Sequence, residues 1–172
     1  MSNTGVLILE CIDKADPGSE GRFLSHMFNL MGVNSQYVEI RTKRQFLMML
    51  ETSPFKTIHI TTHGAITNKQ FRAFWTPNGA VRLEALSDDV LSDKALVSTA
   101  CKSGSKAFAE ALVEKTGARF YIAPTASPRF HNAILFAHWF YHKVFILKVS
   151  VPRAVRDYRD GYKNPHDFAI YY

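Results

Sequence analysis

Short apolar runs alternate along the chain with longer stretches in which apolar residues recur every three or four positions. The short runs are typical of buried strands, and the longer stretches are typical of helices with one face on a core. The first run is followed by the turn residues Asp16-Pro17-Gly18. The pattern predicts strands at residues 6–9, 37–40, 57–62, 95–100 and 119–123, and a last short run at 168–172.

Helices are expected between these runs. Thr42 and Gln45 have the spacing of a capping box, so a helix is expected to begin there. The first helix, over residues 19–31, has four apolar residues on one stripe that we expect to face the core: Phe23, Met27, Leu30 and Met31. Further helices are expected at 84–91, 105–115, 131–144 and 152–158.

Strands that alternate with helices predict an α/β fold, a three-layer sandwich with a mostly parallel central sheet of about six strands. Two more runs that resemble strands, at 70–75 and 80–83, flank Thr76-Pro77-Asn78-Gly79. They predict a small hairpin insertion after the third strand. We therefore expect a single domain, 1–172, with one hairpin inserted outside its central sheet.

Composition narrows the class of protein. The chain has 172 residues, of which 47% are hydrophobic and 21% charged, as in an ordinary folded domain. The N-terminus lacks a basic signal region, and the apolar stretch 133–147 is interrupted by His138, His142 and Lys143. We therefore expect a cytoplasmic protein with no membrane span and with free thiols at Cys11 and Cys101.

The net charge of +6 permits a nucleic-acid partner, but the basic residues are scattered and such a partner is not expected. A nucleotide-binding Rossmann domain is disfavoured, because no glycine-rich phosphate motif follows the first strand. No metal and no cofactor are expected. His138 and His142 lie four residues apart, but Trp139 stands where a zinc-peptidase helix would carry glutamate.

The candidate chemistry lies at two strand ends. His63 follows the third predicted strand, and Cys101 follows the fourth. Functional groups in open parallel sheets gather at the carboxyl ends of the strands. If the third and fourth strands are neighbours, a thiol and an imidazole are therefore expected in one cleft. The helix expected after Cys101, with Lys102 and Lys106, would favour a thiolate. The N–H groups of Gly64 and Cys101 are candidates for an oxyanion hole.

These residues also carry a resemblance. The segments IHITTHG, ending at Gly64, and LVSTACKSG, which contains Cys101, are similar to the two motifs of the caspase-like CHAT family. The apolar helix ending at Phe140-Tyr141, the segment 150–158 and the run from Asn164-Pro165 to Tyr171 resemble that family's closing elements. The family is known for cysteine endopeptidases of caspase–hemoglobinase fold.

The resemblance implies that Cys101 is the nucleophile, that His63 is the general base and that Gly64 helps to form the oxyanion hole. It implies a thioester acyl-enzyme, a protein or peptide substrate, and control by a regulatory protein partner, an assembly or a homodimer. The loop after the fifth strand is expected to shape the substrate pocket through Thr125, Ala126 and Ser127. The alternative is a catalytically silent interaction or scaffold module of the same fold.

Other candidates have plainer interpretations. Cys11 is expected to be a small buried residue. His59 shares a strand face with His63 and is expected to be a hydrogen-bonded core residue. Phe71, Phe74 and Trp75 in the hairpin are expected to be packing residues, with an apolar wall beside the cleft as the alternative.

Overall fold

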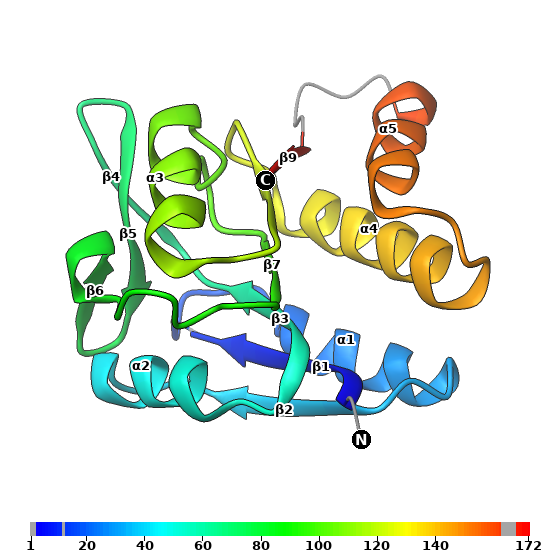
Figure 1. Cartoon of the computed structure of the whole chain (residues 1–172), viewed down its shortest axis with the longest axis horizontal. Coiled ribbons are helices and arrows are strands. Elements are labelled where there is room, and N and C mark those ends of the chain that lie inside the picture. Colours follow the sequence, from blue (N-terminus) through cyan, green and yellow to red (C-terminus); the bar gives the residue numbers. More distant parts are fainter. Residues whose placement is uncertain (1–2, 12, 163–167) are drawn as a thin grey trace.

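A computed structural model describes residues 3–11, 13–162 and 168–172. Its centre is a six-stranded sheet with the order β2-β1-β3-β7-β8-β9, in which every neighbouring pair is parallel except β8 and β9 (Figure 1). The α/β class and the mostly parallel sheet are thus confirmed. The strands are β1 Asn3–Glu10, β2 Ser35–Glu39, β3 Phe55–Thr61, β7 Ala95–Ser98, β8 Phe120–Pro124 and β9 Phe168–Tyr171.

Helices cover both faces of this sheet and make three layers, with α2 and α3 on one side and α1, α4 and α5 on the other (Figure 1). Alternate residues of each strand feed two separate apolar clusters, as the period of two requires. Leu7 and Leu9 join the first cluster, whereas Val6 and Ile8 join the second. The helices are α1 Glu20–Leu30, α2 Lys43–Thr52, α3 Lys106–Thr116, α4 Phe130–Tyr141 and α5 Val151–Gly161.

The face that α1 buries differs from the predicted stripe. Phe23 is 41% exposed and Leu30 is 91% exposed, so that part of the prediction is wrong. The buried face instead carries Leu24, Phe28 and the carboxylate of Glu20. The face is rotated because Glu20 finds polar partners inside the protein, and these partners belong to distant strands.

Helix ends follow the predicted signals. The backbone N–H of Gln45 donates to Thr42 Oγ1 over 3.1 Å, which confirms Thr42 as the N-cap of α2. Ser19 caps α1 in the same way through the N–H of Arg22. Gly117 ends α3 with a left-handed φ of 66°, which glycine adopts at little cost.

The insertion after β3 is a three-stranded antiparallel sheet rather than a hairpin alone. Its strands are β4 Gly64–Thr67, β5 Gln70–Thr76 and β6 Gly79–Arg82. Phe71 and Phe74 are buried and pack edge-to-face on Phe108 of α3, whereas Trp75 is 43% exposed. The predicted packing role is therefore confirmed for the two phenylalanines.

The helix predicted at 84–91 is wrong. The structure has only a 3-10 turn there, Leu83–Ala85. Asp89 takes a left-handed φ of 57°, and its backbone N–H donates to the carbonyl of Lys115 at the end of α3. Leu91 donates likewise to Thr116. The backbone donors that a helix would use internally are used here to tie the loop to α3.

Two further findings concern the chain as a whole. The resemblance placed on Asn164-Pro165 falls outside the described residues. Among the residues that the structure does describe, no helix is both long enough and apolar enough to cross a bilayer.

Candidate active site

The predicted nucleophile and base lie in one cleft. Strands β3 and β7 are parallel neighbours, with Ile60 paired to Ser98, and His63 and Cys101 each follow three residues later. Both side chains line the same cleft at the carboxyl edge of the sheet. His63 exposes 43% of its side chain, and Cys101 is half-buried.

Gly64 brings the two segments into contact. A Cβ at this position would collide with the carbonyl oxygen of Cys101 and would press on the ring of Phe71. Glycine is therefore required here by the close approach of the Cys101 backbone. In the described part of the chain, no hydrogen bond engages the backbone N–H of Cys101, which suits a role as an oxyanion donor.

The turn after Cys101 is rigid and strained. Lys102 has a left-handed φ of 59°, and its N–H donates to the carbonyl of Ala126 over 2.8 Å. The buried Ser103 hydroxyl donates to the carbonyl of Ala100 and meets the hydroxyl of Ser98 at 3.0 Å. Such strain persists only where the surroundings hold it, and it is concentrated at functional sites.

This turn separates Cys101 from α3, which begins at Lys106. The helix dipole acts mainly within the first turn of a helix. Cys101 therefore lies outside the first turn of α3, and the expected effect of this helix on its thiol is not supported.

Asp16 orients the imidazole of His63. Its Oδ1 lies 2.7 Å from Nε2 of His63, and its Oδ2 accepts the backbone N–H of Asp13 over 2.8 Å. Because a carboxylate only accepts, Nε2 carries the proton and Nδ1 is the nitrogen left for exchange with the thiol. Sequence reasoning missed this residue, which it assigned only to a turn. The signal that could have identified it is an acidic residue in the loop after β1, because β1 is the parallel neighbour of β3.

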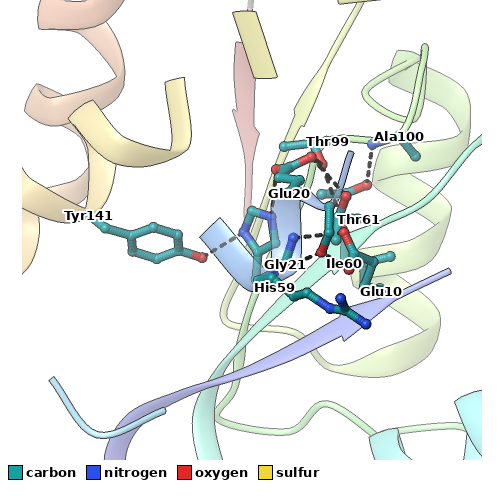
Figure 2. Close-up of polar contacts among 12 residues, drawn as sticks. Glu10, Glu20, Gly21, His59, Ile60, Thr61, Thr99, Ala100 and Tyr141 are labelled. Carbon is teal, nitrogen blue, oxygen red and sulfur yellow. Dashed lines mark hydrogen bonds and ion pairs between the residues drawn. The ribbon is translucent and has the colours of Figure 1, made fainter. Parts of the chain in front are cut away.

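A buried carboxylate ties together the two strand ends that carry the pair. Glu20 Oε2 accepts the hydroxyls of Thr61, over 2.8 Å, and of Thr99, over 2.9 Å (Figure 2). Thr61 lies two residues before His63, and Thr99 lies two residues before Cys101. Glu20 thereby links the segments that precede His63 and Cys101.

His59 continues this network into the core. Its Nε2 lies 3.1 Å from Glu20 Oε1, and its Nδ1 lies 2.9 Å from the hydroxyl of Tyr141, as Figure 2 shows. The side chain is completely buried, so the expectation of a hydrogen-bonded core histidine is confirmed. Burial, with the nearby charge of Glu20, raises the pKa of Tyr141 well above its usual value, so its hydroxyl remains a donor.

The cleft is acidic. Glu10, Asp16 and Glu20 line it, and no lysine or arginine does so among the described lining residues. Glu10 is 3% exposed and accepts the N–H of Gly21 over 2.7 Å and the hydroxyl of Tyr37 over 2.8 Å. These donors hold the carboxylate without a cation within ion-pair distance in the part of the chain described.

The two cysteines differ although both line the cleft. Cys11 is 5% exposed, and burial raises the pKa of its thiol to about 12, so it is protonated at neutral pH. The expectation of a small buried residue at Cys11 is confirmed. The opposite wall comes from Pro128, Phe130 and Ala133, with the ring of Phe130 6.1 Å from that of His63.

The predicted substrate-binding residues lie just beside this wall. None of Thr125, Ala126 and Ser127 is among the described lining residues, which resume at Pro128, directly after Ser127. Ala126 has a structural role, because its carbonyl accepts the N–H of Lys102 and so supports the turn after Cys101.

No cluster of three His, Cys, Asp or Glu side chains suited to a metal ion occurs among the described residues. A scan of the sequence against protein-family models finds no match, and a search of curated proteins finds none either. The resemblance to the CHAT family therefore stays a prediction from two motifs, and the function has to be argued from the geometry of the cleft.

Proposed function

We propose that the protein is a cysteine endopeptidase, with Cys101 as nucleophile and His63 as general base. The observation that carries the proposal is the shared cleft, in which Asp16 fixes His63 through Nε2 and Cys101 follows the adjacent strand. A nucleophile, a base and a group that orients the base are the three parts that covalent acyl transfer requires.

The chemistry follows from these positions. His63 Nδ1 takes the thiol proton as Cys101 Sγ attacks the carbonyl carbon of the scissile peptide bond. The N–H of Cys101 donates to the oxyanion of the tetrahedral intermediate. The carbon–nitrogen bond breaks, the leaving amine takes the proton from His63, and a thioester remains. Water, deprotonated by His63, then attacks the thioester and releases the acid and the thiol.

The charge of the cleft favours one class of substrate. Three carboxylates line a narrow space of about 40 Å³, and the apolar wall of Pro128 and Phe130 faces them. An extended peptide that presents a lysine or arginine side chain complements both, since its methylene stem suits the wall and its charge suits the carboxylates.

Cleavage of candidate protein and peptide substrates by the purified chain tests the proposal. Wild type is expected to cut, and Cys101→Ala and His63→Ala are expected to lose cutting while they keep the fold. Peptides with lysine or arginine before the scissile bond are expected to be cut faster than matched peptides with glutamate. Equal cleavage by wild type and Cys101→Ala would refute the proposal. Substrate binding without any cleavage would support the interaction module instead.

A further inference from the structure

A second hollow lies at the amino edge of the same sheet. It has a volume of about 470 Å³ and is lined by the starts of β1, β3 and β8 and by the end of α4. Pockets for small molecules measure roughly 300–1,000 Å³, and this hollow, which is open to solvent, lies within that range. A space of this size beside the core is therefore a candidate binding site.

The interior of this cavity is apolar. Its walls include Val97 from the sheet, Phe120 at the start of β8, and Phe140 and Tyr141 from α4. The hydroxyl of Tyr141 is already bonded to His59, and the two other hydroxyl groups of the lining belong to Thr4 and Thr57 at the starts of β1 and β3. An apolar cavity of this kind does not hold water well, but it accepts an apolar ligand body.

The wall nearest to α5 is formed by an irregular helical turn. After Tyr141 the backbone widens into a π-helix, His142–Ile146, which places Val144 and Phe145 on the cavity. π-helical turns are rare, and they occur frequently at functional sites. The irregularity lies where it shapes the cavity.

The rim of the cavity is basic. Lys56 and Arg119 lie on it and are exposed, and among the described residues neither has an ion-pair partner. Lys94 lies close by, where burial and then the charge of Lys56 lower its pKa. Asp93 is the one carboxylate on the described rim. An anion at the rim would relieve this crowding of positive charge.

We propose that this cavity binds an organic anion with a single apolar body, of the class of a medium-chain carboxylic acid. The hydrocarbon chain lies against the partly exposed side chains of Val144 and Val151, and the carboxylate lies at the rim between Lys56 and Arg119. The cavity lies at the opposite edge of the sheet from Cys101, so the proposal stands whether or not the chain is a peptidase.

Titration of the full chain with decanoate, followed by calorimetry and by NMR of the valine methyl groups, tests this proposal. Decanoate is expected to bind with shifts at Val144 and Val151. Decanol and decylammonium are expected to bind at least about tenfold more weakly, because they lack the charge that the rim complements.

Two variants locate the binding. Arg119→Glu, at an exposed position, is expected to weaken decanoate binding about tenfold, whereas Arg82→Glu on β6 leaves it unchanged. Val144→Trp fills the cavity and is expected to abolish decanoate binding. Leu147→Trp, at a side chain that is 53% exposed and lies outside the cavity, is expected to leave the binding unchanged. Equal binding of all three ligands, or decanoate binding that survives both Arg119→Glu and Val144→Trp, would overturn the proposal.

Discussion

The two edges of the central sheet contain hollows of opposite character. The cleft at the carboxyl edge is narrow, about 40 Å³, and is lined by carboxylates, two thiols and an imidazole that its neighbours hold in place. The cavity at the amino edge is about 470 Å³ and largely apolar, with cations at its rim. Reaction chemistry needs groups held at fixed positions, whereas the binding of an apolar body needs space. One sheet provides both because its two edges meet different loops.

A buried polar chain joins the two edges. Tyr141 lines the cavity, its hydroxyl bonds to His59, and His59 bonds to Glu20. Glu20 in turn holds the threonines just below His63 and Cys101. We therefore expect substitutions in the cleft to lower activity and substitutions in the buried polar chain to lower stability. A substitution where the two strand ends touch is expected to lower both.

The largest effect is expected at Asp16, which acts on activity and little on stability. Asp16→Asn leaves one acceptor oxygen where the carboxylate has two and removes the negative charge, so it can no longer accept from both the N–H of Asp13 and Nε2 of His63. The tautomer of His63 is then held less well, and the cleavage rate is expected to fall about a hundredfold. Asp13→Asn, in the same loop, is the matched control, because its carboxylate accepts the N–H of Ala15 rather than that of His63. Steady-state cleavage and urea denaturation of both variants measure the two effects. Loss of stability in step with activity would show that Asp16 serves the fold.

Gly64 is expected to act on both properties. Gly64→Ala places a Cβ against the carbonyl of Cys101, so His63 and Cys101 must move apart. We expect the cleavage rate to fall at least about tenfold and the free energy of unfolding to fall by about 1–3 kcal/mol. Gly18→Ala is the control, since Gly18 also lines the cleft but a Cβ there meets nothing within 4 Å. Similar results for the two alanine variants would contradict the close approach.

Tyr141 tests the connection between the edges. Tyr141→Phe removes the donor to His59 Nδ1 and leaves a buried acceptor without its partner, at a cost of about 1–2 kcal/mol in the free energy of unfolding. The effect on cleavage is expected to be smaller than tenfold, because Glu20 still holds the threonines. Tyr172→Phe, at a side chain 71% exposed, is the control. Equal free energies of unfolding for the two variants in urea would show that the hydrogen bond from Tyr141 to His59 does not stabilise the fold.

The smallest expected effect is that of Cys11 on the free energy of unfolding, and it depends on pH. Its folded pKa of about 12 lies above the reference value of 9.0 because burial disfavours the thiolate. The protonated buried thiol therefore stabilises the fold fully below pH 9, and this contribution is lost as pH rises toward 12. Between pH 8 and 10 wild type is expected to lose about 1 kcal/mol more stability than Cys11→Ala. Parallel pH dependence in urea denaturation would contradict this assignment.

The positions of the strands in the chain could be predicted from the sequence, whereas the pairing of β3 with β7 came from the structure. The short apolar runs placed β3 and β7, and the rule that functional groups gather at carboxyl ends then placed His63 and Cys101 in one cleft. Both steps depend on local patterns, since a run of buried residues and the turn after it lie within a few positions. The capping of α2 by Thr42 was predictable for the same reason.

Long-range polar contacts could not be predicted in this way. The residues next to Asp16 in the sequence indicate only a turn. Its contact with His63, which lies 47 positions later, is not visible in that local pattern. Glu20 reads as a solvent-facing carboxylate, yet it is buried because Thr61 and Thr99 donate to it. Burying Glu20 turned α1 and exposed Phe23, so one missed contact also changed the predicted core face.

The central claim is that Cys101, and not Cys11, is the activated thiol. Treatment of the native chain with a lysine-containing peptide chloromethyl ketone, followed by intact-mass and peptide-mapping mass spectrometry, tests it directly. We predict one adduct per chain, located at Cys101, whose formation slows strongly in His63→Ala and in unfolded protein. An adduct mainly at Cys11, or equal rates at Cys101 in native, His63→Ala and unfolded chains, would contradict the account.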